Sequence, residues 1–172
     1  MKDNIPKEPL VALIKEIDSK LTRKIDLYAV GGTAMTLLDL KASTQDIDFN
    51  LKPEDYAEFI KAKDKVVHGY RVDVYQNGAI FTQQLPEDYV NKSIPIKIKF
   101  EKINLYSIHP LDIVVTKIGR LNERDFEDIK DCINKYHLKK KDVESRGKEI
   151  IYAGNEANYK YNLADVLKKM SH

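Results

Sequence analysis

Three aspartates are the residues of this chain whose type and spacing best fit a chemical site. Asp46 and Asp48 stand one residue apart in "STQDIDFNL", and Asp73 lies in "RVDVY". A strand would project Asp46 and Asp48 from the same face, about 6.5 to 7 Å apart. Mg²⁺ requires converging oxygen ligands, whereas ionised carboxylates without a cation disfavour one another. The pattern therefore indicates a divalent metal site, with a solvated strand edge as the simpler alternative.

The residues that alternate with the aspartates are apolar, which predicts that both segments are strands anchored in a core. These residues are Ile47, Phe49, Val72 and Val74. Two neighbouring strands would then present all three carboxylates on one face of a sheet. On this basis Asp46, Asp48 and Asp73 are the candidate metal ligands.

A glycine pair before the acidic strand offers the other half of a nucleotide site. Gly31 and Gly32 follow the apolar run "LYAV" and precede a predicted helix over residues 33–40. Glycine has no Cβ, so phosphate can approach the backbone, and a helix N-terminus supplies N–H groups and a favourable dipole. Thr33 would add a hydroxyl. These three residues are the candidate phosphate ligands, although tight strand-to-helix turns also use glycine for steric reasons alone.

The elements that must position these residues alternate between helix and strand in the first part of the chain. Helices are predicted over residues 7–22, 33–40 and 53–63, and strands over 27–30, 46–51, 70–75, 94–100 and 103–108. The remaining pattern is helical, over residues 110–121, 123–136, 140–153 and 159–170. The sequence thus predicts an α/β or α+β fold, with a mixed β-sheet flanked by helices in residues 1–108. Residues 109–172 are expected to form a helical C-terminal segment packed on that domain.

Composition limits the class of protein. The 172 residues are 42% hydrophobic, which is enough for a domain with a sizeable core. Their 29 basic and 27 acidic residues nearly balance, so no global field marks a nucleic-acid or membrane binder. Cys132 is the single cysteine, residues 1–9 are polar, and no later stretch predicts a membrane span. A cytoplasmic protein without a membrane partner is therefore expected.

The stretches "VGGTAMTLL", "STQDIDFNL" and "RVDVY" together resemble the nucleotidyltransferase superfamily, whose fold is that of DNA polymerase beta. The resemblance implies a minimal nucleotidyltransferase fold in which Asp46 and Asp48 hold metal ions on a nucleoside triphosphate. It implies that Asp73 assists an attacking hydroxyl, which would belong to a protein, an RNA or a small molecule. Mg²⁺ or Mn²⁺ would be the cofactor. Typical members carry serine after the first glycine, where this chain has Gly32, so the phosphate contacts are expected to differ.

A later stretch, "HPLDIVVTKIGRLNERDFEDI", is similar to a segment of abortive-infection-type and related uncharacterised nucleotidyltransferase-like proteins. The residues that match are Asp112, Lys117, Arg124, Asp125 and Asp128. The similarity makes Lys117 a candidate catalytic and nucleotide-binding residue and Arg124 a candidate nucleotide-binding residue. The alternative is a solvated helix with ion pairs along it. Because the superfamily includes members with no demonstrated transfer activity, a second hypothesis is a catalytically silent, nucleotide- or partner-binding component of a toxin–antitoxin-like pair with a cognate partner protein.

Overall fold

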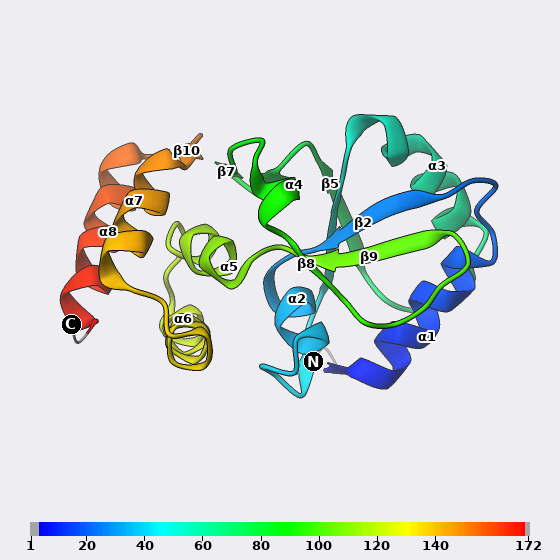
Figure 1. Ribbon diagram of the computed structural model, residues 1–172, viewed down its shortest axis with the longest axis horizontal. Coiled ribbons are helices and arrows are strands. Elements are labelled where there is room, and N and C mark those ends of the chain that lie inside the picture. Colours follow the sequence, from blue (N-terminus) through cyan, green and yellow to red (C-terminus); the bar gives the residue numbers. More distant parts are fainter. Residues whose placement is uncertain (1–3, 171–172) are drawn as a thin grey trace. The chain divides into compact units, whose positions relative to one another are not determined.

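The computed structural model describes residues 4–170 and has the mixed α/β fold expected from the sequence (Figure 1). The chain divides into two compact units. The first comprises the residues up to Gly78 together with Ser93–Ser107, and the second comprises Ala79–Lys92 together with the residues from Ile108 onwards. The 14 residues Ala79–Lys92 thus interrupt the sequence of the first unit and belong to the second. Within residues 4–170, no helix is both long and apolar enough to cross a bilayer.

A mixed sheet with the strand order β5-β4-β2-β9-β8 forms the centre of the first unit. Its strands are β2 (Ile25–Ala29), β4 (Ile47–Leu51), β5 (Val72–Gln76), β8 (Ile94–Pro95) and β9 (Ile103–Ser107). β2 runs parallel to β9 and antiparallel to β4, while β4 runs parallel to β5. The β4–β5 register places Asp48 opposite Asp73 and Asn50 opposite Tyr75.

The two faces of β4 differ because its apolar and polar residues alternate. Ile47, Phe49 and Leu51 are fully buried, and the Phe49 ring meets Phe59 edge-on with centroids 5.8 Å apart. Phe59 belongs to α3, so this helix covers the apolar face. The opposite face of β4 and β5 carries the polar residues. The helices of this unit are α1 (Lys7–Asp18), α2 (Gly31–Leu37) and α3 (Pro53–Asp64), and a small ladder joins β1 (Ile5–Pro6) to β3 (Ser43–Thr44).

Helix α1 ends at Asp18, earlier than its apolar periodicity predicts, and the side chain of this last helical residue contacts a distant turn. Its carboxylate accepts hydrogen bonds from the backbone N–H groups of Glu101, Lys102 and Ile103 at 3.0, 2.8 and 2.8 Å. A buried carboxylate that satisfies three backbone donors is strongly stabilised. Asp18 therefore joins the end of α1 to the turn that leads into β9.

The strand predicted over residues 94–100 is wrong for most of its length, since β8 ends at Pro95. The Ile96 N–H still donates to the Leu105 carbonyl at 2.9 Å, but the Ile98 N–H donates to the Ile96 carbonyl at 2.8 Å. This tight turn takes the chain out of the ladder. β8 lies at the sheet edge and contains a proline that cannot donate, so alternation of isoleucine and lysine was not enough to extend it.

The second unit combines helices with a small sheet. Its helices are α4 (Tyr89–Lys92), α5 (Pro110–Lys117), α6 (Glu123–Tyr136), α7 (Lys140–Glu149) and α8 (Glu156–Lys169). The sheet has the order β10-β7-β6, from β6 (Ala79–Ile80), β7 (Gln83–Gln84) and β10 (Ile151–Tyr152). Pairing of β7 with β10 joins residues 79–92 to this unit. Helix α7 ends at Glu149 rather than at the predicted residue 153, because β10 begins at Ile151. Two-residue strands have no periodicity that a sequence pattern could reveal.

Candidate active site

The polar face of β4 and β5 carries two of the three predicted aspartates side by side. Asp48 and Asp73 are partners in the parallel register. Asp48 is buried, with 8% of the residue exposed, whereas the Asp73 side chain is 28% exposed. Asp46 lies in the bend directly before β4 and is half-buried. The structure therefore brings Asp48 and Asp73 into register and leaves Asp46 at the entrance of the strand.

Tyr75 belongs to the same surface and was missed by the sequence patterns. Burial raises the pKa of Tyr75 to about 12, and the charges of Asp48, Asp73 and Asp46 act in the same direction against the opposing charge of Arg71. All three aspartates thus lie within electrostatic reach of one phenol. Its position two residues after Asp73 places it on the same strand face, and this spacing was the signal available in the sequence.

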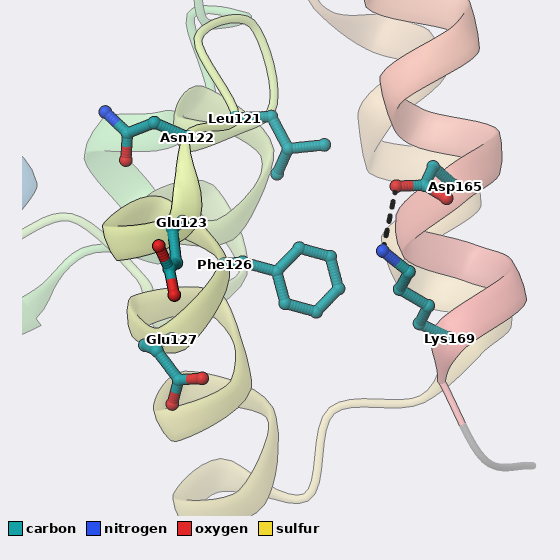
Figure 2. Close-up of a pocket in the computed structure, with 7 residues that line it drawn as sticks. All are labelled: Leu121, Asn122, Glu123, Phe126, Glu127, Asp165 and Lys169. Carbon is teal, nitrogen blue, oxygen red and sulfur yellow. Dashed lines mark hydrogen bonds and ion pairs between the residues drawn. The ribbon is translucent and has the colours of Figure 1, made fainter.

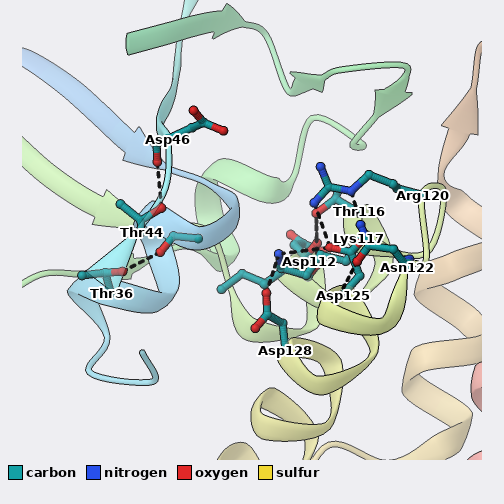
Figure 3. A network of polar contacts seen from close by, with 12 residues as sticks. Thr36, Thr44, Asp46, Asp112, Thr116, Lys117, Arg120, Asn122, Asp125 and Asp128 are labelled. Atoms are coloured by element: carbon teal, nitrogen blue, oxygen red, sulfur yellow. Dashed lines mark hydrogen bonds and ion pairs between the residues drawn. The ribbon is translucent and has the colours of Figure 1, made fainter. Parts of the chain in front are cut away.

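Threonine hydroxyls hold the backbone around the aspartates. The Thr33 hydroxyl donates to the Asp46 carbonyl at 3.1 Å and accepts from the Asp48 N–H at 2.9 Å. The Thr44 hydroxyl donates to the same Asp46 carbonyl at 2.7 Å (Figure 3). Thr33 is fully buried, so the hydroxyl predicted to contact phosphate is engaged in fixing the aspartate backbone.

Glycine occurs at positions 31 and 32 of the turn for two different structural reasons. Gly31 adopts φ +55°, in the left-handed region, and a Cβ there would lie 3.8 Å from Oδ2 of Asp48. Its absence leaves the space beside this carboxylate open. A Cβ on Gly32 would lie 2.7 Å from the Thr44 Oγ1, which is closer than van der Waals contact allows. Glycine at position 32 is therefore required by the packing of Thr44.

Arg71 is the cation next to the acidic pair. Its Nε lies 3.2 Å from Oδ2 of Asp73, and its side chain is 66% exposed. Exposed ion pairs of this kind contribute little stability, so a cation that binds Asp73 more tightly could displace the Arg71 guanidinium. Within residues 4–170, no three His, Cys, Asp or Glu side chains are arranged as a metal-binding group. Asp73 is paired with Arg71, and Asp46 precedes β4, which begins at Ile47.

In the second unit, Lys117 is buried in an ion-pair network. Its Nζ lies 3.1 Å from Oδ2 of Asp128 and 3.7 Å from Oδ1 of Asp125, and its side chain is 10% exposed. Arg120 donates to both oxygens of Asp125 at 2.9 and 2.8 Å, and the Asn122 side chain caps α6 on the Asp125 N–H (Figure 3). In this structure Lys117 joins α5 to α6.

The pKa of Asp125 reports on the same network. Burial alone would raise that pKa, but the hydrogen bonds from Arg120 and the charges of Lys117 and Arg120 outweigh burial and lower it. Asp125 is therefore held as a carboxylate at the start of α6, where a negative charge also suits the helix dipole.

The other two residues of the resemblance have contrasting environments. Asp112 is fully buried and accepts from Arg146, with Nε to Oδ1 at 2.6 Å and Nη2 to Oδ2 at 3.1 Å. Arg146 also donates to Asp88 and Glu149 at 2.9 and 3.0 Å. Arg124 is exposed on α6, and among the described residues it has no ion-pair partner. Arg124 thus differs from Lys117 and Arg120, which both form ion pairs with Asp125.

A glycine turn, a short helix and a DxD strand paired with a second acidic strand are the features by which the nucleotidyltransferase class was expected. A family model described as a nucleotidyltransferase of unknown function (DUF6036) matches residues 8–169. The chain therefore belongs to this family, which confirms the expected class. Comparisons with curated proteins and with solved structures give no significant match.

Proposed function

We propose that this chain is a metal-dependent nucleotidyltransferase that moves a nucleoside monophosphate from a nucleoside triphosphate to a hydroxyl acceptor. The acceptor would be carried by a protein, an RNA or a small molecule. The observation that carries the proposal is the register of Asp48 and Asp73 beside a glycine turn. Membership of a nucleotidyltransferase family supports it.

Asp46, Asp48 and Asp73 would hold Mg²⁺ or Mn²⁺. The donors fit these ions because all three supply carboxylate oxygen, the ligand that hard divalent cations prefer. Gly31 fits as well, since its missing Cβ leaves room beside Oδ2 of Asp48. When bound, such ions neutralise phosphate charge and stabilise the attacking and leaving oxygens of an in-line displacement.

The chain's own residues would divide the remaining work. Thr33 and Thr44 fix the backbone on which Asp46 and Asp48 are mounted. Backbone N–H groups of the Gly31–Thr33 turn would contact the phosphates, because the Thr33 hydroxyl is already engaged. Arg124 would attract the triphosphate by its charge, and Lys117 would support nucleotide binding through the network that it stabilises.

In the proposed reaction Asp73 accepts the proton of the acceptor hydroxyl. The hydroxyl oxygen then forms a bond to the α-phosphorus, and the bond from that phosphorus to the bridging oxygen of the β-phosphate breaks. The products are the nucleotidylated acceptor and pyrophosphate. This step requires no oxidant or further reactant.

The test is incubation of the chain with Mg²⁺, a cell extract and each of the four triphosphates, labelled with ³²P at either the α- or the γ-phosphate, followed by identification of the labelled species. Transfer of α label but not of γ label is expected, which separates nucleotidyl transfer from phosphoryl transfer. Asp48→Asn is the matched control and should give no label. Triphosphate binding without transfer from any nucleotide would favour the catalytically silent, partner-binding alternative.

A further inference from the structure

A groove of about 310 Å³ lies between α6 and α8, both in the second unit (Figure 2). It is formed by residues that take no part in the proposed nucleotide site. The side chains that matter are Leu121, Phe126, Glu123, Glu127, Asp165 and Lys169. Two of these are apolar, three are carboxylates and one is an ammonium, so acidic charge predominates.

The ammonium group of the Lys169 side chain already occupies part of the groove. Nζ of Lys169 lies 4.5 Å from the centroid of the Phe126 ring and 3.3 Å from Oδ2 of Asp165 (Figure 2). A cation over an aromatic face with a carboxylate beside it is the arrangement by which proteins recognise organic ammonium ions. The side chains of Lys169 and Asp165 are 56% and 35% exposed, so this contact is weak enough for exchange.

The opposite wall supplies further negative charge. Glu123 and Glu127 lie one turn apart on α6, and side chains at this spacing are neighbours on a helix surface. Among residues 4–170, neither glutamate has an ion-pair partner. The single ammonium group of Lys169 therefore cannot neutralise the three carboxylates of the groove. The remaining negative charge is complementary to a cation with more than one positive group.

The size of the groove selects a small ligand. Its volume lies at the lower end of the range for small-molecule sites. A stable protein interface buries more than about 1,000 Å² and needs an apolar centre, whereas this groove offers only Leu121 and Phe126.

We infer that the groove binds a small aliphatic diamine or polyamine. One ammonium group replaces that of Lys169 between Phe126 and Asp165, another lies near Glu123 and Glu127, and the methylene stem covers the apolar floor. This inference does not depend on the proposed transfer reaction.

The test is calorimetric titration of spermidine into the full chain at low salt, where saturable binding at one site is expected. Phe126→Leu keeps an apolar side chain but removes the ring, and should weaken binding by up to about fivefold. Glu127→Gln should weaken it by about two- to fivefold through loss of one carboxylate. Lys169→Met removes the internal competitor and should tighten binding. Lys168→Met and Glu144→Gln, outside the groove, are the matched controls and should change nothing.

Absence of saturable spermidine binding would overturn the inference. So would equal affinities for the parent, Phe126→Leu and Glu127→Gln, because binding would then be spread over the surface. Weaker binding by Lys169→Met would show that the lysine supports the site rather than competes for it, and would also contradict the assignment. Glu127 is exposed, so its variant should fold and give a decisive answer even if Phe126→Leu does not.

Discussion

Asp48 and Asp73 stand directly opposite each other on the parallel strands β4 and β5. Like charges in opposing positions destabilise a sheet. The fold tolerates the pair because Arg71 lies beside Asp73 and because the Thr33 hydroxyl fixes the backbone of Asp48. An arrangement that costs stability in the free protein is expected where a cation is to be bound.

The first prediction is that Asp48→Asn stabilises the free protein. Removal of one of two opposing charges should raise the free energy of unfolding in EDTA by up to about 1 kcal/mol. The same variant should lose the stabilisation that Mg²⁺ with triphosphate gives the parent by mass action. Urea denaturation with and without Mg²⁺ and triphosphate measures both effects. Asp64→Asn is the control, because this side chain at the end of α3 is 64% exposed. A response to Mg²⁺ with triphosphate that survives in Asp48→Asn would place the metal elsewhere.

The second prediction concerns Asp73. Asp73→Asn should bind Mg²⁺ and a non-hydrolysable triphosphate nearly as the parent does, while transfer falls by roughly 10² to 10⁴ through loss of a general base. Calorimetry and the transfer assay measure the two effects separately. Asp64→Asn should leave both nearly unchanged because this side chain is 64% exposed and lies on α3, outside the proposed site. Loss of binding in Asp73→Asn would show that this carboxylate serves mainly as a metal ligand.

The third prediction is that Gly32 and Thr44 are energetically coupled. Gly32→Ala places a Cβ 2.7 Å from the Thr44 Oγ1 and should cost roughly 1–3 kcal/mol of stability. In the background of Thr44→Ala the nearest remaining atom is the Cβ at 3.6 Å, so the same change should cost much less. A double-mutant cycle of unfolding free energies measures the coupling. Additive effects would mean that this contact does not require glycine at position 32. Phosphate binding would then be the better explanation for this glycine.

The fourth prediction concerns the buried pair of Arg146 and Asp112. Arg146→Met leaves the Asp112 carboxylate buried without its bidentate donor and should destabilise the fold by about 3–5 kcal/mol. Replacing both partners, as Arg146→Met with Asp112→Leu, should recover most of that loss. Lys148→Met on the same helix is the control, since its side chain is 69% exposed. A loss below 1 kcal/mol for Arg146→Met in denaturant melts would contradict the assigned role.

The fifth prediction is a change in acid stability. The folded pKa of Asp125 lies below its ordinary value, so the ionised group stabilises the fold above the unfolded pKa of about 3.9. That contribution is lost as the pH falls through the folded pKa. Arg120→Gln should raise the pKa of Asp125 and move acid unfolding to higher pH, as measured by circular dichroism. Arg124→Gln, which removes a charge without an ion pair, should leave the midpoint in place; an equal shift in both variants would point to net charge instead.

Elements with strong local patterns were predictable from the sequence. Helix α6 follows its predicted range because an asparagine cap precedes a regular apolar stripe. The alternation in β4 correctly predicted which face is apolar, and hence that Asp48 lies opposite to Phe49. The side-by-side position of Asp48 and Asp73 follows from two such strands being neighbours.

Features that depend on distant partners could not be predicted. The Thr33 hydroxyl is directed to the backbone of residues 46 and 48, a contact that no local pattern encodes. The motif made Lys117 a candidate nucleotide ligand, but a motif shows which residues are present and not that Lys117 pairs with Asp128 and Asp125. Arg146 lies 34 residues from Asp112 and had no signal of its own. The strands β6, β7 and β10 exist only through their pairing with one another.

The discontinuity of the second unit has a cost during synthesis. The first unit gains its last strand at Ser107, when Asp88 still lacks Arg146, a partner 58 residues further along the chain. Domains generally fold as units while the chain emerges, so the sheet of the first unit can form while residues 79–92 still lack their partners from the later part of the second unit. Leu85 and Tyr89 lie in this segment and are buried in the finished protein, so they are expected to stay exposed until the rest of the second unit has been made. Residues 79–92 are therefore the stretch of the nascent chain at which a chaperone or a neighbouring chain would bind first.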